Sequence, residues 1–362
     1  MRVVSVVGTR SDLVKCAPIA RALGEDHSLV HTGLPFDYGT DDGFFADLEL
    51  PPPAYDLGVT GGTNAQNLQA ILAGLLERLT DPVEWLLVYG GSAATIAGAI
   101  VGAKRSIPVA HIGAGLRSYR RRTPDEVNHI VVDHLSRLHF CPTPRAVEAL
   151  AREGLTEGVH QVGDVLLDNV VRGLEIGKRA PLASLADRIG VDPAQPFAVA
   201  TIHHHENLDD ESRLASLIQA FSALPWPVVL PLHPRTQESL TERWDVASRI
   251  GANISIVDPL RPIEALLAVS RAWVVLTDSG GLQRESFFLG VPCVTLRDDS
   301  EWVDTIDVAH NVVAGADPEA IERAARSAAR APDPMRTVPL DTPFGDGTAG
   351  RRIVDILRRG VG

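Results

Sequence analysis

The sequence of 362 residues lacks the features that mark secreted, membrane-spanning or nucleic-acid-binding proteins. Its three cysteines, Cys16, Cys141 and Cys293, are scattered and outside any metal-ligand spacing, which argues against a disulfide framework and predicts reduced core thiols. There is no apolar run of about 18 residues and no basic-then-apolar leader, so we expect a cytoplasmic protein that does not enter a membrane. The net charge of −12 argues against nucleic acid or an anionic membrane as a partner.

Two domains are expected, because 362 residues exceed what a single hydrophobic core normally serves. With 45% hydrophobic and 22% charged residues, the composition is that of an ordinary globular protein. Strand-like apolar runs alternate with helical patterns, which favours doubly wound α/β domains with parallel sheets. The expected organisation is a Rossmann-like domain over 1–175, a Pro- and Gly-rich connection at 176–196, a second Rossmann-like domain over 196–345, and a last helix, 350–359, that packs back on the first domain.

The stretch from Leu276 to Glu285 carries the strongest local signal for a ligand. A strand-like run leads into Ser279-Gly280-Gly281, and a helical pattern follows. A helix that starts there presents free backbone N–H groups and the positive end of its dipole, which suits a diphosphate. The glycines let a ligand approach the backbone, and Glu285 is placed to accept hydrogen bonds from sugar hydroxyls. A plain strand-to-helix turn explains the same spacing equally well.

A glycine turn near the amino end is a second candidate anion site. The first strand-like run breaks at Gly8, and Lys15 falls in the first turn of the helical pattern that follows. Arg10 and Lys15 beside a helix start would clamp a phosphate, although solvated basic side chains fit the pattern as well. Ligands of doubly wound sheets sit beyond the carboxyl ends of the strands, where the turns at Gly8, Gly90 and Gly113 fall.

Six short motifs occur in one order along nearly the whole chain, and together they are far more specific than any one alone. They are Gly8-Thr9-Arg10 with Lys15, Ala114-Gly115-Leu116-Arg117, Pro124-Asp125-Glu126 with Asn128, Thr201 and His203 with Glu206-Asn207, Thr277-Asp278-Ser279-Gly280-Gly281 with Gln283 and Glu285, and Phe344-Gly345-Asp346-Gly347. In these motifs the chain resembles the UDP-N-acetylglucosamine 2-epimerase family, whose members have the two-domain GT-B glycosyltransferase fold. The resemblance implies two domains facing a cleft, a UDP-sugar substrate, no cofactor, no metal and a homodimer.

The resemblance also assigns roles to individual residues. The diphosphate would be held by Ser279, Gly280 and Gly281, and the ribose hydroxyls by Glu285. The phosphates would also be reached from the two sides of the cleft by His203 and by Arg10 with Lys15. The sugar pocket would be lined by Gly91, Gly113, Arg117, His204 and His205.

Two carboxylates of the family are absent from this chain. Family members that act as epimerases carry an Asp where Gly91 stands and a Glu where Gly113 stands. In addition, Asp125 replaces a Glu, while His129 and Trp302 each replace an Arg. The family reaction removes the proton on C2 of the sugar while UDP departs from C1, and both then return. A positioned base and acid are each worth roughly 10²–10⁴-fold in such a reaction, and glycine supplies neither.

The remaining ionisable residues leave three functions open. The catalytic candidates are Asp125, Glu126 and His203, with His129, His204 and His205 as further ionisable groups. The first function is a divergent UDP-N-acetylglucosamine 2-epimerase, which the whole-chain resemblance favours. The second is a UDP-sugar-dependent glycosyltransferase, since the loss of two carboxylates leaves room for an acceptor hydroxyl near C1. The third is a nucleotide-sugar-binding protein without catalysis.

Three consecutive histidines, His203, His204 and His205, raise the question of a metal. Neighbouring residues at a strand end point in alternating directions, so their rings are not expected to converge. No second cluster at ligand spacing accompanies them, and we therefore expect no metal site.

Overall fold

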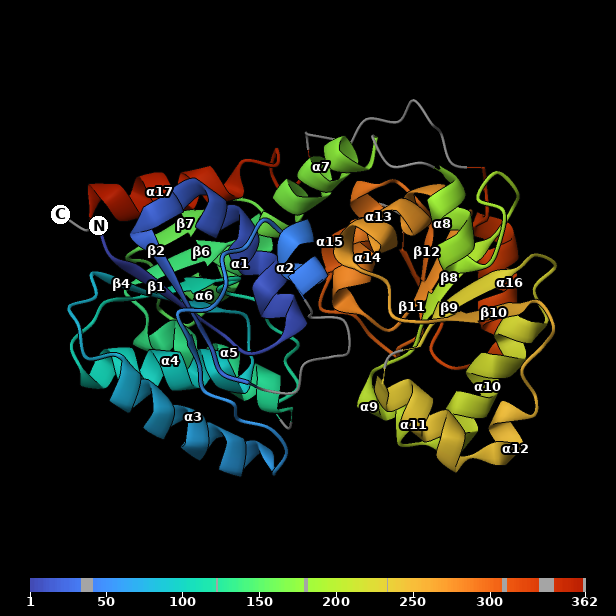
Figure 1. Cartoon of the computed structure of the whole chain (residues 1–362), viewed down its shortest axis with the longest axis horizontal. Coiled ribbons are helices and arrows are strands. Elements are labelled where there is room, and N and C mark those ends of the chain that lie inside the picture. Colours follow the sequence, from blue (N-terminus) through green and yellow to red (C-terminus); the bar gives the residue numbers. More distant parts are fainter. Residues whose placement is uncertain are drawn as a thin grey trace. The chain divides into compact units, whose positions relative to one another are not determined.

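The computed structural model describes residues 1–33, 42–121, 123–178, 182–232, 234–307, 311–331 and 342–360. The chain forms two compact units, Met1–Asn169 with Leu340–Gly362, and Val170–Pro339. Each unit contains one parallel β-sheet with helices packed on it (Figure 1). This confirms the prediction of two doubly wound, Rossmann-like domains. The expected boundary at 175 falls inside a helix, α7 (Val165–Gly177), that crosses from the first unit into the second.

Unit 1 is built on a seven-stranded sheet of order β3-β2-β1-β4-β5-β6-β7, in which every neighbouring pair is parallel. The strands are β1 (Val3–Val7), β2 (His27–His31), β3 (Tyr55–Asp56), β4 (Trp85–Tyr89), β5 (Val109–Ile112), β6 (Leu138–Cys141) and β7 (Val159–Gln161). The helices are α1 (Arg10–Leu23), α2 (Asp42–Asp47), α3 (Asn64–Arg78), α4 (Ala93–Lys104), α5 (Pro124–Leu135), α6 (Pro144–Arg152) and α17 (Ala349–Arg359), with a short 3₁₀ turn, Gly24–Asp26. The sequence patterns missed α2 and β3, which are short.

Alternate residues of each strand face opposite sides of this sheet. On β1, Val3 and Val7 pack in a core cluster with α1 and α17, whereas Val4 and Val6 pack in a second cluster with α3 and α4. Both faces are therefore covered by helices, which is why the strands read as almost continuous apolar runs.

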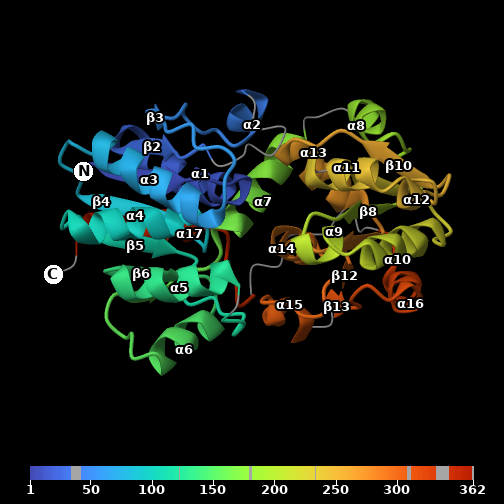
Figure 2. The ribbon, with the colours of Figure 1, turned by 90° about the horizontal axis from the view of Figure 1, so that it is seen from below.

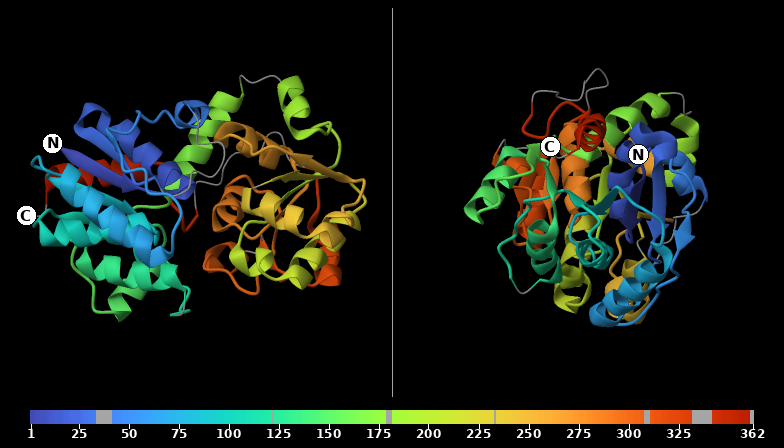
Figure 3. Two further views of the ribbon diagram at one scale, coloured as in Figure 1. Left: turned by 60° about the horizontal axis from the view of Figure 1, so that its bottom comes forward. Right: turned by 90° about the vertical axis from the view of Figure 1, so that its left-hand side faces the viewer.

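The last helix, α17, packs along α1 (Figure 3). The carboxylate of Asp168 accepts hydrogen bonds from two backbone N–H groups at its start, Ala349 at 3.1 Å and Gly350 at 2.8 Å. A Cβ at Gly350 would lie 2.9 Å from Pro18, so the helix approaches α1 at a point where only glycine fits. The chain thus returns to unit 1 after completing unit 2.

Unit 2 is built on a six-stranded parallel sheet of order β10-β9-β8-β11-β12-β13 (Figure 2). The strands are β8 (Ala198–Thr201), β9 (Val228–Pro231), β10 (Ile254–Val257), β11 (Val274–Thr277), β12 (Cys293–Thr295) and β13 (Asn311–Val313). The helices are α8 (Leu182–Ile189), α9 (His205–Leu208), α10 (Glu211–Ser222), α11 (Pro234–Glu242), α12 (Trp244–Ala247), α13 (Pro262–Arg271), α14 (Gly280–Phe288), α15 (Val303–Asp307) and α16 (Pro318–Ala328). Thr277 on β11 is in register with Thr201 and Thr295, so the segments that follow these strands begin side by side.

Two predicted segments differ from the structure. The helical pattern of the sequence predicts one helix over 237–250, and this is wrong, because α11 begins at Pro234 and ends at Glu242 and α12 is a separate short helix. The predicted connection at 176–196 contains α8, whose Leu185 and Ile189 are buried. The helix packs on α13 and β10. Pro and Gly at both ends of the segment concealed the amphipathic pattern between them.

All three cysteines are buried and reduced, as predicted. Burial raises the pKa of Cys16 to about 11 and the pKa values of Cys141 and Cys293 to about 12, so these thiols stay protonated at neutral pH. Among the residues described, no helix is long and apolar enough to cross a membrane.

The buried His27 makes the stability of unit 1 depend on pH. Its Nε2 lies 2.8 Å from Ser5 Oγ, and burial lowers its pKa from 6.5 to about 4. The unfolded chain therefore binds a proton that the folded chain resists, and stability is lost as pH falls from 6.5 towards 4. Urea unfolding at about pH 7 and about pH 5 measures this loss. Between the two pH values the free energy of unfolding should fall by about 1–2 kcal/mol more in wild type than in His27→Gln. Equal losses in the two proteins would contradict this assignment.

Candidate functional site

In unit 2, the buried carboxylate of Asp278 joins the segments that follow β8 and β11. It accepts hydrogen bonds from the backbone N–H groups of His203 at 3.1 Å and His204 at 3.0 Å, and from Asn207 Nδ2 at 3.0 Å. The ring nitrogen Nδ1 of His203 lies 3.4 Å from the same carboxylate, and the side chain is 37% exposed. Asp278 therefore fixes both the backbone and the ring of His203 at the carboxyl end of the sheet.

Helix α14 begins at this same end of the sheet. Ser279 is its N-cap, and Ser279 Oγ accepts a hydrogen bond from the backbone N–H of Leu282. The first N–H groups of a helix have no partner within the helix, and those of Gly280 and Gly281 lie in this first turn. That they bind an anion stays a prediction. Glu285 lies in the second turn of α14. The residues predicted to bind the diphosphate and the residue predicted to bind the ribose thus lie in the first two turns of one helix.

The two glycines of α14 have different surroundings. A Cβ at Gly280 would lie 2.6 Å from Trp302 Nε1 and 2.7 Å from Glu301 Oε1. A Cβ at Gly281 would meet nothing closer than Ser279 Oγ at 3.6 Å. The Trp302 ring is itself held, since the guanidinium of Arg284 lies 3.8 Å from its centroid. Trp302, which the resemblance predicts to replace an Arg, packs over the start of the helix.

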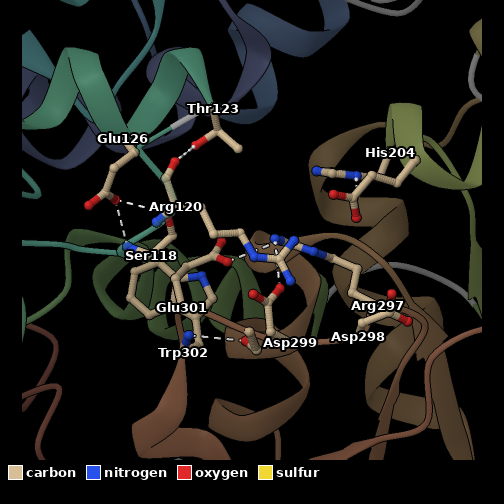
Figure 4. Close-up of polar contacts among 12 residues, drawn as sticks. Ser118, Arg120, Thr123, Glu126, His204, Arg297, Asp298, Asp299, Glu301 and Trp302 are labelled. Atoms are coloured by element: carbon tan, nitrogen blue, oxygen red, sulfur yellow. Dashed lines mark hydrogen bonds and ion pairs between the residues drawn. The ribbon is translucent and has the colours of Figure 1, made fainter.

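Charged side chains line the segment between β12 and α15. Arg297 lies between Glu301, at 3.0 Å, and Asp299, at 3.5 Å, as Figure 4 shows. Trp302 donates its backbone N–H to Ser300 Oγ at 3.0 Å. These contacts fix the position of Trp302 beside Gly280.

The three histidines are not on a strand, so the argument from alternating directions is wrong. β8 ends at Thr201, His204 is the N-cap of α9, and His205 is its first residue. Ligand atoms of His204, His205 and Glu206 lie within 4.8 Å of one another. Burial lowers the pKa of His204, and the positive charge of Arg297 adds to this effect. The expectation that no metal binds here therefore rests on the sequence alone.

In unit 1, the start of α1 is held by a buried carboxylate as well. Asp12 accepts hydrogen bonds from the backbone N–H groups of Gly8 at 3.2 Å and Thr9 at 3.1 Å, and from Ser92 Oγ at 2.9 Å. The turns after β1 and β4 are thereby joined. Arg10, the first residue of α1, places its guanidinium 5.0 Å from the centroid of the Phe44 ring.

Lys15 reaches the turn after β4. A Cβ at Gly90 would lie 2.7 Å from Lys15 Nζ, and Gly90 has a φ of +66°. Glycine at this position therefore gives the ammonium its space and adopts a backbone conformation that other residues rarely take. Lys15 and the turn at Gly90 lie together, as expected for residues at one rim of the sheet.

A buried ionic network lies beneath this rim. Asp133 on α5 is fully buried and lies 2.6 Å from His111 Nδ1 and 2.7 Å from Arg117 Nη2, and it accepts a hydrogen bond from the backbone N–H of Gly115 at 3.2 Å. Burial favours the neutral acid, but His111 and Arg117 outweigh it and lower the pKa of Asp133 below its usual range. Arg117 also pairs with Glu153 at 2.7 Å. The guanidinium predicted to face the sugar is thus bound to two carboxylates.

His111 and Asp133 are not among the residues that the sequence predicted for the site. His111 Nε2 lies 2.9 Å from the carbonyl oxygen of Gly90 while Nδ1 faces Asp133, so both ring nitrogens point at oxygen acceptors. An acidic residue within the apolar half of a helical pattern, as in Ile130-Val131-Val132-Asp133, is a signal that would have identified it.

Two acidic residues at the start of α5 have different environments. Glu126 is 4% exposed, and its carboxylate accepts hydrogen bonds from Ser118 N at 2.7 Å, Ser118 Oγ at 2.9 Å and Tyr119 N at 3.1 Å (Figure 4). It holds the segment before α5 in place, and Tyr119 there has a φ of +59°. Asp125 is exposed in the first turn of the helix. Of the two acids, Asp125 is the one whose carboxylate reaches solvent.

Gly91 and Gly113, which the resemblance predicts to replace two acids, lie just after β4 and β5. Gly113 has a φ of +83°, and a Cβ there would meet nothing closer than Leu116 at 3.8 Å. Gly91 is not in the left-handed region, but it is closely packed against α5. Space is therefore available at Gly113 and absent at Gly91.

A protein-family model described as UDP-N-acetylglucosamine 2-epimerase matches residues 19–358, almost the whole chain. The chain belongs to the UDP-N-acetylglucosamine 2-epimerase family. This confirms the resemblance drawn from the six motifs.

Relatives in this family extend over the same length. A UDP-2,3-diacetamido-2,3-dideoxy-D-glucuronate 2-epimerase of Pseudomonas aeruginosa is 36% identical, covering 99% of this chain and 100% of the relative. A UDP-N-acetylglucosamine 2-epimerase homolog of Methanococcus maripaludis is 34% identical over 99% of each chain. The crystal structure of Methanocaldococcus jannaschii UDP-GlcNAc 2-epimerase, in complex with UDP-GlcNAc and UDP, is 31% identical and superimposes with a TM-score of 0.88, over 99% of this chain and 100% of that one.

The different surroundings of the two helix-start glycines of this family member give a direct test. Gly280→Ala places a methyl group against the held Trp302 ring and should destabilise unit 2 by roughly 1–3 kcal/mol. Gly281→Ala makes the same chemical change in open space and should be neutral or stabilising, because Ala is the better helix former. Thermal unfolding of both variants compares them. Equal melting temperatures for the two would contradict the packing of Trp302 on Gly280.

Proposed function

We propose that this chain is a UDP-N-acetylglucosamine 2-epimerase that converts UDP-N-acetylglucosamine (UDP-GlcNAc) into its C2 epimer. The observation that carries the proposal is the family match over residues 19–358, together with a relative of the same length whose structure contains UDP-GlcNAc and UDP. Under this proposal the free N–H groups of Gly280 and Gly281 bind the diphosphate. Glu285 binds the ribose hydroxyls, and His203 contributes a ring fixed by Asp278. Arg10 and Lys15 bind the diphosphate from unit 1.

The proposed reaction is an elimination followed by a re-addition. A base takes the proton from C2 while the C1–O bond breaks, which gives an unsaturated sugar and free UDP. A proton then adds to C2 from the opposite face, and a UDP oxygen re-forms the bond to C1. No electrons are gained or lost overall, so the reaction is proposed to need neither a redox cofactor nor a metal.

Asp125 is proposed as the base and His203 as the group on the opposite face. Asp125 is exposed at the start of α5, whereas Glu126 beside it is buried and holds the segment at Ser118. The ring of His203 is partly exposed and is oriented by Asp278. Asp125 is therefore proposed because its side chain is exposed, whereas that of Glu126 is buried.

The oligomeric state, the location in the cell and the range of substrates are also proposed. The protein is proposed to act in the cytoplasm as a homodimer, which follows from the composition and the resemblance. A second candidate substrate is UDP-2,3-diacetamido-2,3-dideoxy-D-glucuronate, because a relative named for epimerising it is 36% identical over 99% of this chain. Both sugars carry an acetamido group on C2, so one reaction serves both.

Incubation with UDP-GlcNAc, followed by NMR of the anomeric protons, tests the proposal. A second nucleotide-sugar signal should grow to a constant ratio with the first. Asp125→Asn should lower kcat by at least about 10²-fold with little change in melting temperature. Glu126→Gln should lower the melting temperature, because it weakens the hold on the segment at Ser118.

Three outcomes would speak against the proposal. If neither candidate substrate yields an epimer, the epimerase assignment fails. If UDP is released only when an acceptor is supplied, the chain is a glycosyltransferase. If both acid variants keep full kcat, the base lies elsewhere.

A further inference from the structure

Position 91 is occupied by glycine because of the space that α5 takes. A Cβ on Gly91 would lie 2.7 Å from His129 Cδ2 and 3.0 Å from His129 Nε2. It would also lie 2.8 Å from the backbone oxygen of Asp125. Gly91 is not among the residues with positive φ, so its conformation is open to any residue. Glycine is needed here because its missing side chain leaves space for α5.

Asn128 and His129, two neighbouring residues of α5, contact Gly91. Asn128 Nδ2 donates a hydrogen bond of 2.7 Å to the carbonyl oxygen of Gly91, and the ring of His129 covers its Cα. Since Asp125 is one helical turn before His129, the same contact positions the first turn of α5 against the end of β4.

The His129 ring acts here through its shape. Its Nδ1 is buried and has no hydrogen-bond partner among the residues described. Burial lowers the pKa of His129 to about 3, and the neighbouring charges of His111, Lys15 and Arg117 act in the same direction against Asp133. The ring is therefore uncharged at neutral pH, and it acts on α5 through the space that it fills.

We propose that Gly91 and His129 form a steric lock that sets the position of the first turn of α5, and with it the carboxylate of Asp125. Both are positioning residues for the proposed base, so this inference rests on the proposed function. Glycine at position 91 then leaves the space that the His129 ring occupies. An acidic side chain at this position would push α5 away and displace the carboxylate of Asp125. Gly91→Asp alone should lower the rate.

The lock is tested without any substrate by a double-mutant cycle in thermal unfolding. Gly91→Ala should lower the melting temperature by several degrees in wild type, because the methyl group meets both the ring and the Asp125 carbonyl. In a His129→Ala background the ring contact is gone, and the same change should cost clearly less. His134→Ala, an exposed change on the same helix, is the control background in which the full cost should remain. Equal costs in all three backgrounds would overturn the lock.

The positioning role is tested by kinetics with UDP-GlcNAc. His129→Ala should lower kcat on the order of tenfold or more with KM nearly unchanged, because a displaced base slows proton transfer and leaves UDP binding in place. His129→Phe restores the ring without its nitrogens and should recover most of kcat. His134→Ala should match wild type.

The outcomes separate the two proposals. An inactive wild type that still shows coupling in the unfolding cycle refutes the proposed function and with it the positioning role, while the packing of the lock stands. An active wild type with unchanged kcat in His129→Ala overturns the positioning role and leaves the function in place. A His129→Phe variant as slow as His129→Ala shows that the ring nitrogens matter, which contradicts a lock that acts by shape.

Discussion

Buried carboxylates that accept hydrogen bonds from loop N–H groups hold the functional ends of both sheets. In unit 2 Asp278 binds the N–H groups of His203 and His204, and in unit 1 Asp12 binds those of Gly8 and Thr9. The same kind of contact recurs between Asp133 and Gly115 N, and between Glu126 and the N–H groups of Ser118 and Tyr119. A carboxylate is a strong acceptor in a low-dielectric environment, and a lost partner would leave buried N–H groups unsatisfied. The loops that form the site are therefore fixed by acids that lie behind them.

This use of acids restricts the chemistry. A buried acid whose oxygens hold backbone N–H groups cannot turn towards a substrate without leaving those groups unsatisfied. Asp12, Asp133, Glu126 and Asp278 are buried and hold neighbouring segments in this way, whereas Asp125 at the start of α5 is exposed. With glycine at 91 and 113, the proposed base rests on a helix turn whose position depends on packing against Gly91. Under the proposed function, the packing of α5 against Gly91 is what places the Asp125 carboxylate.

The sequence predicted most of the fold but only the local part of the site. Strands buried on both faces and glycine turns at their ends are local patterns, so the two doubly wound domains and the Ser279 helix start were predictable. The partners of Asp133 were not, because His111 and Arg117 come from other segments and only the folded sheet brings them to α5. The His129 contact with Gly91 was hidden for the same reason. Arg117 was predicted to face the sugar, but it pairs with Asp133 and Glu153, which are far from it in the sequence.

Proton exchange at C2 is the central step of the proposed epimerisation, and isotope labelling measures it directly. The protein is incubated with UDP-GlcNAc in D₂O, and the recovered nucleotide sugars are examined by NMR and mass spectrometry. Elimination and re-addition predict deuterium at C2 in both epimers, with the rate of its appearance falling in step with kcat in Asp125→Asn. Turnover of the substrate with hydrogen fully retained at C2 would contradict the account.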